Sequence, residues 1–171
     1  TDQAPCFSAA FRSRKLLARM NVAARQILLN RQVAEEVSTV AGLQARLLPR
    51  GGLDMEGVRV EALYRSSGLA SGDYYDYIKL PDGRLRLAVA DVSGHGARAA
   101  FLMAIARTLF HQSAAQGEPL DQALGVLNGQ LVELVGEDKD FITFIAADLD
   151  PYAGTLTWIN AGHCPGLVKT H

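Results

Sequence analysis

The chain has 171 residues, about half of them apolar and a fifth charged, and its formal net charge is −1. This length suits one domain with a sizeable core. The balanced charge provides no electrostatic reason to bind nucleic acid or anionic lipid, so we predict no nucleic-acid partner and no membrane contact by this segment. Two cysteines cannot form a disulfide framework, which favours a cytoplasmic location.

The first predicted element is a long helix over residues 12–50, preceded by a tail over residues 1–11. The helix contains one glycine and no proline before Pro49, and it is roughly 50 Å long at 1.5 Å per residue. Apolar and small residues recur along it at a 3–4 spacing that includes polar Gln44 and ends at Leu48. This seam predicts a signalling helix that pairs with its twin as a coiled coil, and the alternative is a helix packed along its own domain.

Residues 51–171 are predicted to form one globular domain. Its expected elements are strands over residues 58–64, 74–80 and 85–92, helices over 97–116 and 120–135, and strands over 141–149 and 155–159. Short turns, such as Pro81-Asp82-Gly83, join neighbouring strands and therefore imply antiparallel pairing. The expected fold is α+β with antiparallel sheets rather than a doubly wound sheet.

Two acidic motifs stand at the ends of neighbouring predicted strands. Asp73 begins one strand and Asp91 ends the next, and these positions adjoin in an antiparallel pair. Adjacent carboxylates need a cation, and oxygen ligands suit Mg²⁺ or Mn²⁺. The glycine-rich turn after Asp91 lets the carbonyl of Val92 serve as a further ligand, and two such ions activate a bridging water for attack on phosphorus. In the alternative reading, Asp91 only forms a turn or caps a helix.

Other polar residues near these motifs have separate expected roles. Asp76 follows Asp73 by three residues, so strand alternation predicts that it lies on the opposite face. His95 is a candidate general acid or a structural residue of the glycine turn. We expect His163 to be a buried, hydrogen-bonded residue that shapes its loop, and His111 to have a surface or packing role in mid-helix.

The run over residues 72–77, followed by Asp91-Val92-Ser93-Gly94-His95-Gly96, resembles the PPM phosphatases, the protein phosphatase 2C-like superfamily. The resemblance is to the bacterial branch of sigma-factor regulators and sporulation phosphatases. Supporting matches lie at residues 44–49, 99–104, 128, 141–144 and 160–165. The resemblance implies that Asp73 and Asp91 are the catalytic residues and that they hold two Mn²⁺ or Mg²⁺ ions together with the carbonyl of Val92.

The same resemblance implies a metal-dependent serine/threonine phosphoprotein phosphatase in bacterial signalling. Its expected substrate is a small phosphorylated regulatory protein, a STAS-type anti-anti-sigma factor, and a homodimer is expected through the N-terminal helix. The implied fold is an α-β-β-α sandwich of antiparallel sheets, incomplete and C-terminally truncated in this chain, because the family's later Thr-Asp-Gly motif is not found before His171. The alternative function is a catalytically incomplete module of phosphatase fold that acts in dimerisation or partner binding.

Overall fold

A computed structural model of the protein describes residues 5–55, 57–65, 70–137 and 139–169. The chain divides into two compact units, Thr1–Ser38 and Thr39–His171. Helix α1 spans Pro5–Gln44, so it begins and ends earlier than the sequence predicts: residues 5–11 are helical rather than a tail, and residues 45–48 form a turn. Proline suits a first helical position because its missing N–H would have no partner there.

The second unit contains two antiparallel sheets. A small hairpin pairs β1 with β2, and a four-stranded sheet has the order β3-β4-β5-β6. The strands are β1 Leu53–Met55, β2 Val58–Val60, β3 Tyr74–Lys79, β4 Leu85–Val92, β5 Ile142–Asp150 and β6 Thr155–Ala161. The predicted α+β class, antiparallel sheets and long N-terminal helix are confirmed. Strand β1 was not predicted, and the strand expected over residues 58–64 ends at Val60.

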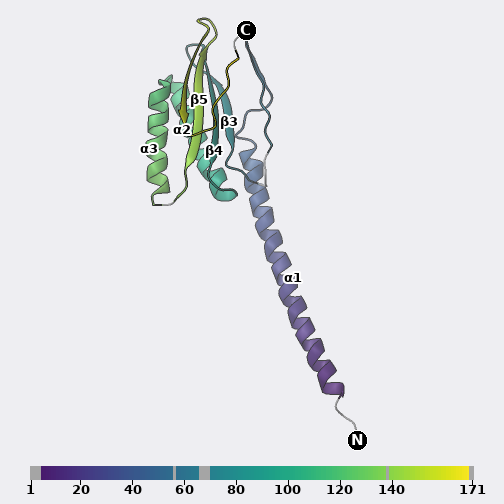
Figure 1. Ribbon diagram of the computed structural model, residues 1–171. Helices are drawn as coiled ribbons and strands as arrows, with labels where there is room; N and C mark the ends of the chain where they lie inside the picture. The colour runs from purple at the N-terminus through teal and green to yellow at the C-terminus, as the bar shows by residue number, and fades with distance from the viewer. Residues whose placement is uncertain (1–4, 56, 66–69, 138, 170–171) are drawn as a thin grey trace. The chain divides into compact units, whose positions relative to one another are not determined.

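Two helices, α2 at Ala97–Gln116 and α3 at Leu120–Val135, lie along one face of the four-stranded sheet (Figure 1). Helix α2 ends at Gly117, whose left-handed φ of 67° closes the last turn by donating to the carbonyl of Ala114. The bounds of α2 and α3 agree with the sequence prediction. None of the helices in the described part of the chain is long and apolar enough to span a membrane.

The core lies between these helices and the sheet. Tyr74, Phe110 and Phe144 are nearly inaccessible to solvent, and their ring centroids lie 5.2 to 6.4 Å apart. Aromatic rings at these separations pack favourably beyond the area that they bury. This cluster ties β3, which follows Asp73, and β5 to α2, so the start of β3 rests on a packed support.

A charged pair is buried in the same layer. Arg86 of β4 lies opposite Asp148 of β5 and donates to both of its carboxylate oxygens, at 2.7 and 2.8 Å. Neither residue is more than 4% exposed. A third donation from Arg86 reaches the carbonyl of Glu118 at 2.7 Å, which fastens the segment before α3 to the sheet.

The segment that follows α1 is held by side chains of β3 and α2. The Arg107 guanidinium donates to the carbonyl of Leu47 at 2.5 Å, and the Tyr75 hydroxyl donates to that of Pro49 at 3.0 Å. Leu48, the last position of the predicted coiled-coil seam, is buried in the core of the second unit. At this position the seam therefore packs within its own domain, which is what the alternative to a coiled coil predicts.

Candidate active site

The register of the strands brings the two predicted aspartates together. Tyr74 pairs with Ala90, so Asp73 and Asp91, one residue further along, adjoin at the end of β3 and β4. Burial raises the pKa of Asp91, and the charge of Asp73 and a hydrogen bond with it raise that pKa further, while the charge of His163 lowers it. The two carboxylates are therefore direct neighbours, as the sequence predicts.

Gly72 fits closely against Val92 at the same end of the sheet. A Cβ added to Gly72 would lie 2.6 Å from the carbonyl oxygen of Val92, and the Val92 amide donates to the Gly72 carbonyl at 3.3 Å. A side chain at position 72 would push the two strand ends apart. The close approach sets the Val92 carbonyl oxygen beside the residue that precedes Asp73.

Ser71 holds the carboxylate of Asp73 directly. Its hydroxyl donates to Asp73 Oδ2 at 2.8 Å and accepts from the Asp73 amide at 3.1 Å. Ser71 is itself bound through its main chain by the side chain of Gln44. Sequence reasoning missed both contacts, because no local pattern reports a hydrogen bond between side chain and main chain across 27 residues.

The residues at this strand end fit a hard divalent cation in their chemistry. Two neighbouring carboxylates and a carbonyl are oxygen ligands of the kind that Mg²⁺ and Mn²⁺ prefer, and the raised pKa of Asp91 reflects first its burial and then the neighbouring charge of Asp73. Within the described ranges, no group of three or more His, Cys, Asp or Glu side chains is placed to hold a metal ion. The carboxylates of Asp73 and Asp91 and the carbonyl of Val92 are thus the oxygen groups that lie together at this strand end.

His163 lies nearer to this site than the sequence suggested. It is half-buried, and its amide donates to Asn160 Oδ1 at 2.8 Å in the loop after β6. Its ring Nδ1 lies 2.8 Å from the hydroxyl of Thr143, which pairs with Asp91 across β4 and β5. His163 is therefore hydrogen-bonded in its loop as expected, but it is half-buried rather than buried, and it also contributes to the electrostatics of Asp91.

Asp76 lies on the opposite, helix-covered face, as strand alternation predicts. It is buried, and its Oδ2 accepts from the Tyr74 hydroxyl at 2.8 Å and lies 2.6 Å from Nε2 of His111. Burial, followed by the charge and hydrogen bond of Asp76, raises the pKa of Tyr74. His111, expected to have a surface or packing role, therefore makes a polar contact with a buried carboxylate, while His95 is exposed in the glycine turn.

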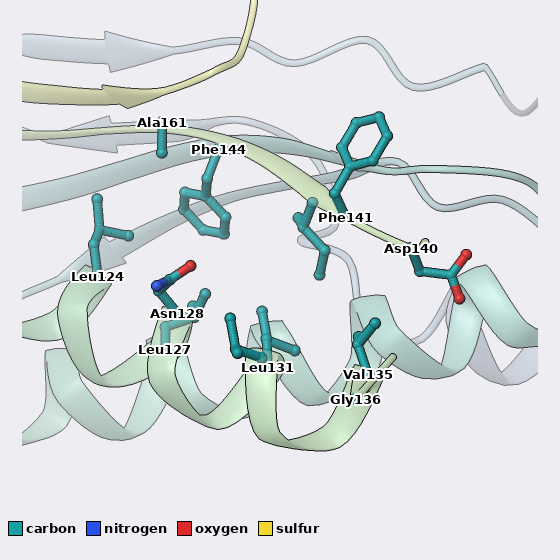
Figure 2. Close-up of a pocket in the computed structure, with 12 residues that line it drawn as sticks. Leu124, Leu127, Asn128, Leu131, Val135, Gly136, Asp140, Phe141, Phe144 and Ala161 are labelled. Atoms are coloured by element: carbon teal, nitrogen blue, oxygen red, sulfur yellow. The ribbon is translucent and has the colours of Figure 1, made fainter. Parts of the chain in front are cut away.

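Two hollows of different character flank the sheet. A cleft of about 540 Å³ contains Asp73, Asp91 and His163 together with four tyrosines. A smaller hollow of about 240 Å³ lies on the helix side, where Leu124, Leu127 and Leu131 of α3 approach Phe144 of β5 (Figure 2). The smaller hollow is lined mainly by apolar side chains and extends the core, so the acidic cleft is the candidate active site.

Comparison with known proteins bears on this site. Residues 81–171 match the family described as Stage II sporulation protein E (SpoIIE). Phosphoserine phosphatase RsbP of Bacillus subtilis is 28% identical over 113 residues, which cover 64% of this chain and 28% of RsbP. Phosphoserine phosphatase RsbU of the same organism is 28% identical over 139 residues, which cover 81% of this chain and 41% of RsbU. The chain thus spans less than half the length of these relatives.

A solved structure shares the fold. The crystal structure of the RsbU and RsbW domains of Rv1364c from Mycobacterium tuberculosis is similar with a TM-score of 0.50 and 32% sequence identity. The similarity covers 58% of this chain and 27% of the other. That structure therefore shares the fold of the matched part of this chain.

Proposed function

Because this chain belongs to the SpoIIE family of PPM-type phosphatases, we propose that it works as a metal-dependent serine/threonine phosphoprotein phosphatase. The observation that carries the proposal is the pair of neighbouring carboxylates, Asp73 and Asp91, at one end of β3 and β4. Like charges held this close call for a cation, and the cleft beside them is open to a protein substrate.

Asp73, Asp91 and the carbonyl of Val92 would hold the Mn²⁺ or Mg²⁺ ions. Two such ions, when bound, supply Lewis-acid polarisation of the phosphoryl group and activation of a water. The protein residues contribute orientation: Ser71 holds the Asp73 carboxylate at 2.8 Å, and Thr143 pairs with Asp91 in the β4–β5 ladder and lies 2.8 Å from Nδ1 of His163. Ligands held by such partners keep the geometry that catalysis requires.

The proposed substrate is a small phosphorylated regulatory protein of the STAS-type anti-anti-sigma class. Two relatives are named phosphoserine phosphatases, and the similar structure combines RsbU and RsbW domains in one protein. We place the activity in the bacterial cytoplasm, where partner switching among sigma-factor regulators takes place.

A homodimer through α1 is part of the same proposal. The described side chains of the first unit include many exposed large apolar residues, which a partner helix would cover. They are Leu16, Leu17, Met20, Val22, Ile27, Leu28, Leu29 and Val33. Sedimentation equilibrium of the full chain tests this assembly, and a monomer at all concentrations contradicts it.

Release of phosphate from a phosphoserine-containing STAS protein tests the enzymatic proposal. We expect the full chain to require Mn²⁺ or Mg²⁺, and Asp91→Asn to lower kcat/KM by at least about a hundredfold, because a metal ligand contributes several kcal/mol. The matched control is Glu133→Gln, an exposed carboxylate of α3, which should retain wild-type activity. Full activity of Asp91→Asn would exclude the assignment.

A catalytically incomplete binding module is the second candidate. It is favoured by the small number of candidate ligands, since no group of three acidic, histidine or cysteine side chains among the described residues is placed to hold a metal ion. Calorimetric titration separates the two functions. No heat of Mn²⁺ binding, together with tight dimerisation, would support the binding module, whereas Mn²⁺ binding that Asp91→Asn abolishes would support the phosphatase.

A further inference from the structure

Gln44, the last residue of α1, is buried and contacts the segment that precedes β3. It is 5% exposed, and its side-chain amide makes two hydrogen bonds to the main chain of Ser71, 27 residues later. Its Nε2 donates to the Ser71 carbonyl, and its Oε1 accepts from the Ser71 amide at 3.1 Å. One side chain thus satisfies both main-chain polar groups of a buried residue that precedes β3.

Ser71 transmits this constraint to Asp73. Its hydroxyl donates to Asp73 Oδ2 at 2.8 Å and accepts from the Asp73 amide at 3.1 Å. The Ser71 hydroxyl thus links the carboxylate of Asp73 to its own main-chain amide. Gly72, between the two, cannot shift toward β4 because it is already in contact with Val92. The strand end is therefore clamped by Gln44 on one side and by Val92 on the other.

We propose that Gln44 is a positioning residue for the metal ligand Asp73, acting through Ser71. The inference rests on the proposed function, because it assigns a role toward the metal that Asp73 would hold. Removal of the Gln44 amide leaves two buried main-chain groups of Ser71 without these partners, and the strand end gains freedom. Removal of the Ser71 hydroxyl frees the Asp73 carboxylate to rotate. Either change lowers metal affinity, since partners that orient a ligand contribute about 10-fold to 100-fold.

The geometry also gives the end of α1 a direct route to the site. Gln44 belongs to the last helical turn, and the following residues, Leu47 and Pro49, are held by α2 and β3. A rotation or shift of that turn would withdraw the Gln44 amide from Ser71. The metal affinity of the strand end thus depends on how the last turn of α1 is seated.

Mn²⁺ affinity and metal-free stability, measured side by side on the full chain, test the positioning role. Gln44→Met keeps the side-chain length and helix preference but removes both hydrogen bonds. We expect it to weaken Mn²⁺ binding about 10-fold in a calorimetric titration. Gln116→Met, at the exposed last position of α2, is the matched control and should bind Mn²⁺ as the wild type does. Thermal unfolding in EDTA reports whether each variant is folded.

Ser71→Ala provides the second test, because it keeps both contacts to Gln44 and removes only the hydroxyl. It should weaken Mn²⁺ binding to a similar extent, and the double variant should be no more than about twofold weaker than the weaker single variant, because both changes break one chain of contacts. Wild-type affinity in either single variant, or additive losses in the double variant, would overturn the inference while leaving the proposed function intact. A wild-type chain that binds no Mn²⁺ overturns both.

Discussion

Charged residues have opposite kinds of neighbours on the two faces of the four-stranded sheet. On the face covered by α2 and α3, Arg86 is paired with Asp148, and Asp76 is in contact with Tyr74 and His111. On the other face, Val89 is 47% exposed and Trp158 is 58% exposed. There Asp73 and Asp91 adjoin as two like charges.

The difference separates charges that serve stability from charges that serve chemistry. A buried ion pair with two short hydrogen bonds stabilises the fold only while both partners remain, and it offers no affinity for a ligand. A pair of neighbouring carboxylates destabilises the metal-free fold and creates affinity for a cation. Substitutions on the two faces should therefore change the free energy of unfolding with opposite signs.

The largest expected effect is the loss of the buried ion pair on the covered face. Asp148→Ala leaves the Arg86 guanidinium buried without its counter-charge, and it should lower the free energy of unfolding by about 3–5 kcal/mol. Urea denaturation in EDTA measures this loss. Asp54→Ala removes an exposed carboxylate of β1 and should stay within about 0.5 kcal/mol of the wild type. Equal losses in the two variants would contradict the assignment of the pair to the core.

An intermediate effect is expected for Tyr74→Phe, which removes one donor to the buried carboxylate of Asp76. The free energy of unfolding should fall by about 1–2 kcal/mol at pH 7. Tyr152→Phe changes a tyrosine that is 83% exposed and should have no measurable effect. If both variants unfold at the wild-type urea concentration, the buried hydrogen bond contributes nothing.

The same variant makes a prediction about alkaline pH. Burial and the neighbouring Asp76 raise the pKa of Tyr74, so the folded chain keeps the phenolic proton where the unfolded chain releases it, near pH 10. Stability should therefore fall by about 1.4 kcal/mol per pH unit above pH 10 through this group. Denaturation series at pH 9 and pH 11 should show a smaller fall for Tyr74→Phe than for the wild type; equal falls would contradict it.

The smallest effect, with the opposite sign, is expected on the open face. The pKa of Asp91 is raised in the folded state, so its contribution to stability is present at low pH and is lost as the pH rises through that pKa. Asp91→Asn removes the repulsion and should raise the free energy of unfolding of the metal-free chain at pH 7, by less than about 0.5 kcal/mol because solvent screens the pair. Glu133→Gln should not change it. A lower stability for Asp91→Asn in EDTA would reverse the comparison of the two faces.

Sequence reasoning located the elements whose signals are local. Strand β4 and helices α2 and α3 have the predicted bounds, because alternation is clear over residues 85–92 and Gly117 ends α2 with a left-handed turn. The short strand β1 was missed, since three residues carry too little periodicity to distinguish a strand from a loop. The meeting of Asp73 and Asp91 could be predicted because one tight turn sets the register of β3 against β4.

The rest of the site depends on contacts between distant segments. Gln44 reaches Ser71 only because the turn after α1 is packed on the domain, and no local pattern reports this. His163 approaches Thr143 because the Asn160 side chain shapes the loop that carries His163. A side-chain contact of this kind leaves no periodic pattern in the sequence. The buried pair of Arg86 and Asp148 did leave a signal, since both occupy the buried phase of their strands.

Asp73, just before β3, and Asp76, within it, lie on opposite faces of the sheet, and this arrangement has a consequence for folding. A slip of one residue along β4 would turn the Asp73 carboxylate into the core and move Asp76 away from its partners on α2, while Tyr74 would lose its place between Phe110 and Phe144. Such a misaligned sheet would bury an uncompensated charge, so it would be strongly disfavoured. The residues that carry the proposed chemistry thus also ensure that the strands align in a single way.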